Sequence, residues 1–237
     1  MATSYPGAID TLTNPTTTDY QDTVDHAAQH TNANDAIEAI QTELGADVAG
    51  PNTDVKTRLD NLRSGNWAPD QLAYVAMAYD PLLCTTQTAL GANGTVYVTK
   101  LWVPVGTITN IVCVVGTAGA TLTANQCYAA LYNDSKAFVK KTADQATAWQ
   151  STGLKTMALG GGAYSNTTAR YMYVVFWANG TTRPAFIRAP GGNAAINGAL
   201  SAANARWASA NTGITTTEPA TLGTFTATAV PYWAALS

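Results

Sequence analysis

The sequence predicts a mainly β protein, with an antiparallel β-sandwich or jelly-roll-like C-terminal domain preceded by a coiled-coil-like helical bundle. The period of the apolar residues changes along the chain. It is three to four residues near the N-terminus, as in a helix, and two residues after Leu72, as in a strand. The charge changes as well, because residues 1–65 hold ten acids and three bases, whereas residues 66–237 hold five acids and nine bases. We therefore expect two structural units.

Residues 1–21 are expected to form an extended anchoring arm. This stretch is rich in Thr, Asn and Pro, with prolines at Pro6 and Pro15, and it has no helical period. A segment of this composition buries little apolar surface by itself. We therefore expect it to become ordered by docking on another surface.

Residues 22–65 are predicted to form a helical trimerisation module. The first helix spans 24–44, which contain no Pro or Gly, and it ends before Gly45, a residue type common just after a helix. A second, short helix is expected from about Asp54 to Arg63. The spacing of four and three residues that marks a heptad seam is followed by His26, His30, Ala33, Ile37, Ile40, Leu44, Val55, Leu59 and Leu62.

The seam predicts association with other copies of the chain. An isolated amphipathic helix of this length is marginally stable, and its apolar face must be covered by something. Isoleucine at successive core positions favours three or more helices over two. We therefore expect a homotrimer with the seam at its centre.

His26 and His30 admit a second interpretation as metal ligands. They lie one helical turn apart and could chelate one ion. The residues between them include no Glu to act as a base, and no third ligand follows in the sequence. We favour bundle positions and expect no metal or other cofactor, although an ion shared between chains on the symmetry axis stays open.

Residues 66–71 are predicted to be a linker, and residues 72–237 a β domain. Alternating Thr and apolar residues predict strands in "TVYVTKLWVPVGTITNIVCVVGTAG", "TGLKTMAL", "ARYMYVVFWANG", "PAFIRA" and "TFTATAVPYWAAL". "CYAALYNDSKAFVKK" predicts two strands joined by an Asn-Asp turn. Residues 194–213 are rich in Ala, Asn and Gly, and we expect a long loop there, with or without one helical turn.

Catalytic chemistry is not expected. Both histidines lie before the β domain, which has only five acids, and their spacing singles out no carboxylate pair: Asp70, Asp80, Asp134, Asp144 and Glu218. No nucleophile elbow or phosphate-binding loop is present. Nucleic acid is not an expected partner, because the longest basic run is Lys140-Lys141. A membrane span is not expected either, because no apolar run reaches about 18 residues.

The three cysteines, Cys84, Cys113 and Cys127, show no metal-binding spacing. Cys113 and Cys127 lie in apolar, strand-like runs, which favours buried free thiols. A disulfide between these two residues across a hairpin is the alternative.

Exposed aromatic residues on the β domain would suit sugar binding. Trp102, Trp177 and Trp233 lie within alternating strands and are expected to be core residues. Trp149 and Trp207 lie in predicted loops. They are therefore our candidates for glycan contact, with packing between subunits as the other interpretation.

The N-terminal sequence carries a family resemblance. "SYPGAIDTLTNPTTTDYQDTVDHAAQHTNANDAIEAIQTELG", followed by "DVKTRLDNL", resembles the N-terminal module of structural proteins of tailed bacteriophages, especially those that infect actinobacteria. Motifs such as "CYAALYNDS" and "TADQATAWQSTGLKTMAL" resemble β-sandwich domains of phage head-fibre, minor tail and capsid-decoration proteins.

The resemblance implies a homotrimeric virion component without catalytic residues. The arm would bind other virion proteins of the capsid or tail, and the β domains would project from the surface of the particle. A carbohydrate-binding module that recognises host surface glycans is the alternative function.

Overall fold

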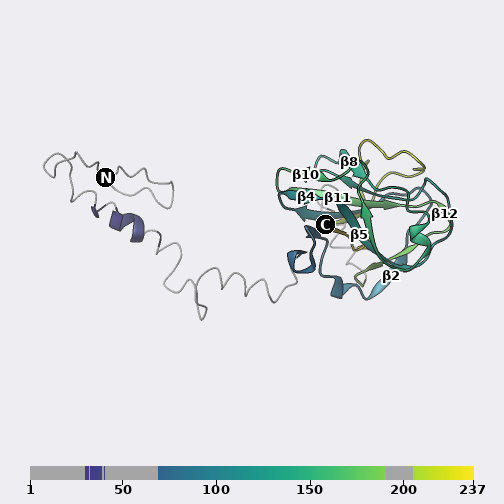
Figure 1. The fold of residues 1–237 in the computed structure, drawn as a ribbon, viewed down its shortest axis with the longest axis horizontal. Coiled ribbons are helices and arrows are strands. Elements are labelled where there is room, and N and C mark those ends of the chain that lie inside the picture. Colours follow the sequence, from purple (N-terminus) through teal and green to yellow (C-terminus); the bar gives the residue numbers. More distant parts are fainter. Residues whose placement is uncertain (1–29, 32, 39, 41–68, 191–204) are drawn as a thin grey trace. The chain divides into compact units, whose positions relative to one another are not determined.

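The structure, a computed structural model, describes residues 30–31, 33–38, 40, 69–190 and 205–237. The chain divides into two compact units, Met1–Gly65 and Asn66–Ser237 (Figure 1). In the first unit, all of the described residues are helical. The predicted arm over 1–21, most of the helical module over 22–65 and residues 66–68 of the linker lie outside the described residues. The described helix is one short stretch, which does not by itself support a coiled-coil module.

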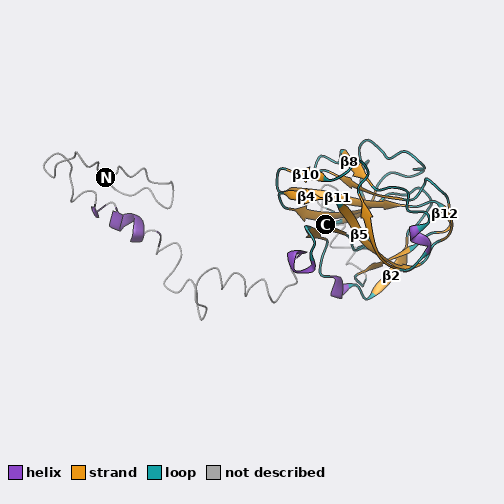
Figure 2. Ribbon diagram, in the orientation of Figure 1, coloured by secondary structure: helices purple, strands orange, loops and turns teal. Residues whose placement is uncertain are grey.

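The second unit is mainly β, and all pairings between its strands are antiparallel, as the sequence predicts (Figure 2). One six-stranded sheet runs in the order β1-β16-β5-β13-β2, and β9 pairs with β5. Its strands are β1 (Ala76–Met77), β2 (Thr86–Ala89), β5 (Asn110–Thr117), β9 (Gly153–Ala158), β13 (Ala185–Arg188) and β16 (Ala235–Leu236).

The other six-stranded sheet has the order β15-β14-β3-β11-β7-β8. Its strands are β3 (Tyr97–Val103), β7 (Tyr128–Tyr132), β8 (Phe138–Lys141), β11 (Arg170–Trp177), β14 (Trp207–Ser209) and β15 (Thr226–Ala227). Strands β7 and β8 form the predicted hairpin. Its turn is closed by Asn133, whose side-chain oxygen accepts a bond from the Ala137 backbone, and Lys136 takes a positive φ of 63° there.

Short elements close the ends of the two sheets. β4 (Gly106–Ile108) pairs with β10 (Tyr164–Asn166), and β6 (Ala120–Leu122) pairs with β12 (Gly180–Thr182). The described residues of the unit also form three 3-10 turns: η1 (Pro69–Leu72), η2 (Pro81–Leu83) and η3 (Ala148–Gln150). Asp80 caps η2 by accepting a bond from the backbone of Leu82 at 2.8 Å. No helix among the described residues is long and apolar enough to span a membrane.

The main core lies between the two large sheets. Alternate residues of β5, namely Ile111, Cys113 and Val115, share one apolar cluster with alternate residues of β11, namely Met172, Val174 and Phe176. This sharing follows from the two-residue period of a strand, which turns every second side chain to the same face.

A second apolar cluster covers the opposite face of β11. Tyr173, Val175 and Trp177 pack there with Leu222 and Phe225, which come from the segment that follows β14. Because both faces are covered, every residue of β11 from Met172 to Trp177 is buried.

Polar contacts hold the covering segment, residues 211–225, in place. The Lys141 ammonium lies 2.5 Å from the Glu218 carboxylate, and the Tyr132 hydroxyl donates to the Pro219 carbonyl at 2.8 Å. The Lys136 ammonium lies 3.9 Å from the centre of the Phe225 ring. The cover does not extend to the far end of the sheet, and this open end positions the candidate site.

Candidate functional site

Two large aromatic side chains stand exposed at the open end of the second sheet. Trp102 on β3 and Tyr171 on β11 are cross-strand partners, and their side chains are 54 % and 50 % exposed. Their ring centres lie 5.1 Å apart in an edge-to-face arrangement. Such pairs attract through their quadrupoles, so the two rings form a stable apolar platform on the surface.

Lys100 lies next to this platform. It is two residues before Trp102 on β3, so both side chains lie on the same face of the sheet. Its ammonium lies 4.5 Å from the centre of the Tyr171 ring and 5.9 Å from that of Tyr173. Burial, and to a smaller extent the positive charge of Arg206, lower the pKa of Lys100 below its usual value.

A groove runs beside the platform. It has a volume of about 500 Å³ and is lined by Pro69, Met77, Ala78, Lys100, Leu101, Trp102, Tyr171 and Arg206. A second cavity of about 200 Å³ shares Ala78, Lys100 and Arg206 with the groove and is lined further by Tyr79, Leu83, Ala189 and Trp207. We call the two together the aromatic groove. Its walls combine apolar rings with two cationic side chains, which suits a ligand with both apolar and polar faces.

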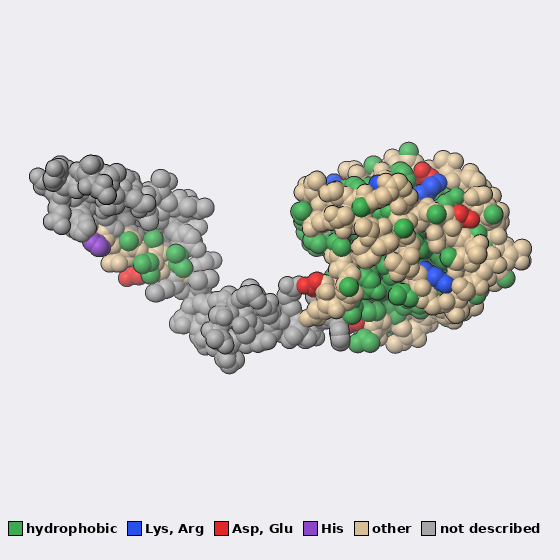
Figure 3. All heavy atoms as spheres, in the orientation of Figure 1, with side chains coloured by type: hydrophobic (Ala, Val, Ile, Leu, Met, Phe, Trp, Pro, Cys, Tyr) green, Lys and Arg blue, Asp and Glu red, His purple; other side chains and the backbone are tan. Residues whose placement is uncertain are grey.

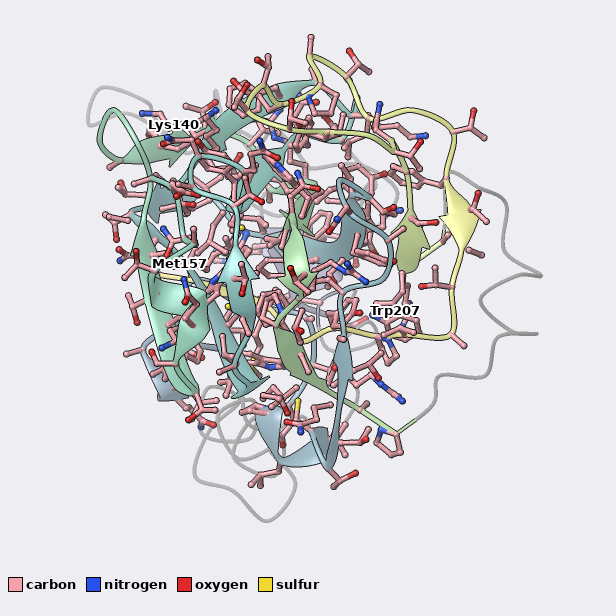
Figure 4. The ribbon with its side chains drawn as sticks, turned by 90° about the vertical axis from the view of Figure 1, so that its right-hand side faces the viewer. Lys140, Met157 and Trp207 are labelled. Carbon is pink, nitrogen blue, oxygen red and sulfur yellow. The ribbon has the colours of Figure 1, made fainter. Side chains whose placement is uncertain are left out.

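Trp207 is the predicted glycan contact that lies in this groove. The sequence predicts a loop around it, but the structure places it on β14, paired with Thr99 of β3, and half-buried. The loop prediction was wrong because a three-residue strand inside an Ala- and Asn-rich stretch has no detectable period. Figure 4 shows Trp207 on the side of the β unit away from Met157 and Lys140.

The prediction that Trp149 is a glycan contact on the surface is wrong. Its side chain is fully buried, and its ring centre lies 5.1 Å from that of Phe186 and 6.4 Å from that of Phe176. The polar residues around it predict a loop, and the chain does make a short 3-10 turn there. That turn folds inward, since the Trp149 carbonyl accepts a bond from Gly119, and the indole therefore fills the core.

Of the three tryptophans that were predicted to be core residues, two are buried and one is exposed. Trp177 and Trp233 are buried as expected, and their indole nitrogens donate to the carbonyls of Thr215 and Tyr79. Trp102 is exposed, which corrects its assignment to the core. Sequence reasoning therefore missed Lys100, Trp102, Tyr171 and Arg206. The signal available was the two-residue spacing of Lys100 and Trp102.

The cysteines are free thiols in the structure, so the alternative of a disulfide between Cys113 and Cys127 is not realised. Both of these side chains are buried, as predicted, and Cys84 is half-buried. Burial raises the pKa of each thiol, to about 11 for Cys84 and Cys127.

The acids of the β unit serve structural roles where their contacts are described. Asp144 accepts backbone bonds from Asn125 and Cys127, and Asp134 accepts one from Ser135 in the hairpin turn. Among the described residues, no group of three His, Cys, Asp or Glu side chains could hold a metal ion. On the face drawn in Figure 3, charged side chains are few and scattered over the β unit.

Four residues of the predicted seam fall within the described helix. His30, Ile37 and Ile40 are exposed, and Ala33 is half-buried. Ile37 and Ile40 keep 51 % and 43 % of their surface exposed. The other seam residues lie outside the described part of the chain: His26, Leu44, Val55, Leu59 and Leu62.

The chain matches no protein-family model and no curated protein sequence.

Proposed function

We propose that the protein is a non-enzymatic structural component of a tailed-phage virion. In this proposal it is a homotrimeric fibre or decoration spike, anchored to the particle by its N-terminal arm through capsid or tail proteins. A helical bundle formed by 22–65 joins the three chains, and sandwich-like β domains project outward. The sequence resemblance of the N-terminal segment supports this proposal.

The observation that carries the proposal is the exposure of Ile37 and Ile40 on the described helix. Three residues apart, they share one face with Ala33 and His30. Each isoleucine leaves about half of its surface in water, and its burial would contribute on the order of 1 kcal/mol per chain. A symmetric bundle of helices would bury this surface, and isoleucine on the seam favours three helices over two.

Sedimentation equilibrium of the full chain at micromolar concentration tests the trimer. We expect the mass of three chains for the wild type and of one chain for Ile37→Asp, because a buried carboxylate without a partner is strongly unfavourable. Thr31→Asp is the matched control, because it adds the same charge away from the apolar face. A wild-type monomer, or an Ile37→Asp variant that stays trimeric, would overturn the bundle.

The association alone does not identify a virion protein, so the particle must be tested as well. Antibodies raised against the β unit should decorate particles in electron micrographs, with the label outside the capsid or tail wall. Disrupted particles that show no band for the protein on a blot with the same antibodies would contradict the proposed location.

A second function, carbohydrate binding for host recognition, is favoured by the aromatic groove. Trp102 and Tyr171 offer exposed rings against which the apolar face of a sugar can pack. The polar side chains of Lys100 and Arg206 line the same groove. We expect Trp102→Ala to abolish binding on a glycan array. The control is Leu154→Ala, which removes an equally exposed apolar side chain from the other sheet. An array with no bound glycan would eliminate this candidate.

A further inference from the structure

Strand β9 is an edge of the six-stranded sheet that contains β5, and it pairs with β5 on one side only. The Leu159 amide, just after β9, donates to the Thr109 carbonyl at 2.9 Å. Bonded and non-bonded pairs alternate in an antiparallel ladder, so the backbone groups of Leu154, Thr156 and Ala158 point away from β5. No backbone hydrogen bond joins these three residues to another described residue on that outer side.

This edge lacks the features that discourage further pairing. Free edges are commonly protected by outward charges, prolines or bulges, because an unprotected edge adds strands from other chains. Residues Gly153–Ala158 include no proline, and their ladder to β5 has no shift of register. Their one charged side chain, Lys155, turns back along the chain, since its ammonium donates to Ser151 Oγ at 2.9 Å and to the Thr152 carbonyl at 3.3 Å. The side chain of Leu154 is 59 % exposed, so the edge is open to a further strand.

The opposite edge of the same sheet is β2, which pairs with β13. The Leu90 amide donates to the Pro184 carbonyl at 3.0 Å, so by the same alternation the backbone groups of Gln87 and Ala89 point away from β13. Both of these residues are exposed. The Tyr232 hydroxyl donates to the Ala89 carbonyl at 2.8 Å, which leaves the two amides and the Gln87 carbonyl for a neighbour.

The directions of the two edge strands suit assembly from head to tail. The pairings from β9 to β5, from β5 to β13 and from β13 to β2 are all antiparallel, so β2 runs opposite to β9. Rotation about an axis parallel to the strands preserves their direction, and β9 of one copy would therefore meet β2 of the next as an antiparallel neighbour. A ring of three copies needs two different surfaces at each contact, and two unlike free edges provide them.

We propose that β9 of one copy pairs with β2 of the next in the homotrimer, so that this sheet continues from chain to chain. The pairing rests on the proposed trimer and adds a contact between the β units. Strands this short bury less than the about 1,000 Å² that a stable interface needs, so β units without the bundle stay monomeric at micromolar concentration. The bundle holds three β units together and raises their effective concentration toward the millimolar range.

Hydrogen exchange of the backbone amides at single-residue resolution tests the pairing in the full chain. We expect the three outward amides of β9 and the Gln87 amide of β2 to exchange at least about tenfold more slowly in the wild type than in Ile37→Asp, whose chains are no longer joined. The amides of Lys155 and Met157, the latter labelled in Figure 4, bond to β5 in both proteins. They are controls within the same strand and should exchange equally in the two proteins.

Two variants change the edge and leave the bundle intact. Thr156→Pro removes one outward donor and keeps the ladder to β5, because proline is tolerated where the N–H of an edge strand faces outward. Leu154→Lys places a charge on the contact. Each should restore fast exchange of the Gln87 amide and of the remaining outward amides of β9, while sedimentation still gives three chains. Val105→Lys, at an equally exposed apolar residue between β3 and β4, is the control and should change neither.

The outcomes separate the edge pairing from the trimer. A trimeric wild type whose outward β9 amides exchange as fast as in Ile37→Asp would overturn the edge pairing and leave the trimer standing. A monomeric wild type would overturn both. Slow exchange of the outward β9 amides without slow exchange at Gln87 would overturn β2 as the partner strand. If Thr156→Pro fails to fold, Leu154→Lys and the wild-type comparison still decide.

Discussion

Trp149 and Trp233 are both fully buried, but the surroundings of their indole nitrogens differ. The Nε1 atom of Trp233 donates to the Tyr79 carbonyl at 2.9 Å. Among the described residues, the Nε1 atom of Trp149 is the buried side-chain nitrogen or oxygen that has no hydrogen-bond partner. A buried donor without a partner destabilises the fold by the free energy of its lost hydration.

This difference predicts unequal effects of the same substitution. Trp149→Phe removes an unpaired donor, whereas Trp233→Phe removes a hydrogen bond and leaves a carbonyl unpaired. We expect the free energy of unfolding to fall by about 1–2 kcal/mol more for Trp233→Phe than for Trp149→Phe. Urea denaturation followed by circular dichroism measures both, and equal losses would contradict the assignment of the two environments.

The thiols should react in a defined order. Cys84 is half-buried, and Cys113 and Cys127 are buried. In the folded chain we expect iodoacetamide to modify Cys84 first and the other two only after unfolding. Because burial raises the pKa of Cys84 to about 11, its rate should grow about tenfold per pH unit between pH 8 and 10.

Mass spectrometry of tryptic peptides identifies the modified thiol. A rate that levels off below pH 9 would contradict the raised pKa. Modification of Cys113 in the folded chain would contradict its burial.

At the scale of single residues, the sequence predicts burial well only where the surrounding sheet is regular. Trp177 and Trp233 were assigned correctly, because Trp177 lies in the apolar strand β11 and Trp233 lies in the apolar segment just before β16. Trp102 also lies in such a strand, but it is exposed because the segment that covers the sheet does not extend to it. Trp149 lies in a polar stretch and is buried because its turn folds inward. Both errors depend on contacts between residues far apart in the sequence, which local pattern does not contain.

At the scale of elements, the covering segment 211–225 depends on the contact between Lys141 and Glu218. Burial acts to raise the pKa of Glu218, but the hydrogen bond and charge of Lys141 and a backbone bond outweigh it, so the pKa lies below its usual value. A carboxylate with a lowered folded-state pKa stabilises the fold above its unfolded-state pKa of about 4.3, and this stability is lost as the pH falls through the folded value.

Glu218→Gln should therefore lower stability at pH 7 by up to about 1 kcal/mol, the range for a solvent-accessible ion pair. The difference between wild type and variant should shrink as the pH falls below about 4. Thermal unfolding at pH 3, 4, 5 and 7 measures it. Asp134→Asn is the comparison and should lose less stability, because the Asp134 carboxylate is more exposed and its contact with Arg170 is longer, at 3.8 Å. A difference that persists at pH 3 would indicate that packing, and not charge, explains the loss.

Strands were predictable where one face is buried and the turn has favoured residues. The hairpin β7–β8 and strands β9 and β13 were found in this way. β14 was missed because it has three residues and because its pairing with β3 brings together positions about 108 apart in the sequence. The register between such distant segments is set by the assembled sheet.

At the scale of the whole molecule, the division into two units predicts that the second can fold by itself. The described members of its three apolar clusters all belong to the second unit. We expect a chain of residues 66–237 to give a monomer with the strand signal of the full protein and a thermal midpoint within a few degrees of it. Sedimentation and circular dichroism measure this.

A fragment that is unfolded would contradict the independence of the units. A fragment that still forms trimers would place the association in the β unit and away from Ile37 and Ile40. The charge balance and the change of period predicted two units from sequence, but the trimer itself stays a prediction.

The burial of β11 on both faces limits where this protein can vary. A polar substitution from Met172 to Trp177 would place a polar group in one apolar layer or the other, so we expect substitutions to be tolerated better at the rim of the sheet than within this strand. Tyr171 and Trp102 lie on that rim. New recognition properties could therefore arise there while the scaffold beneath remains intact.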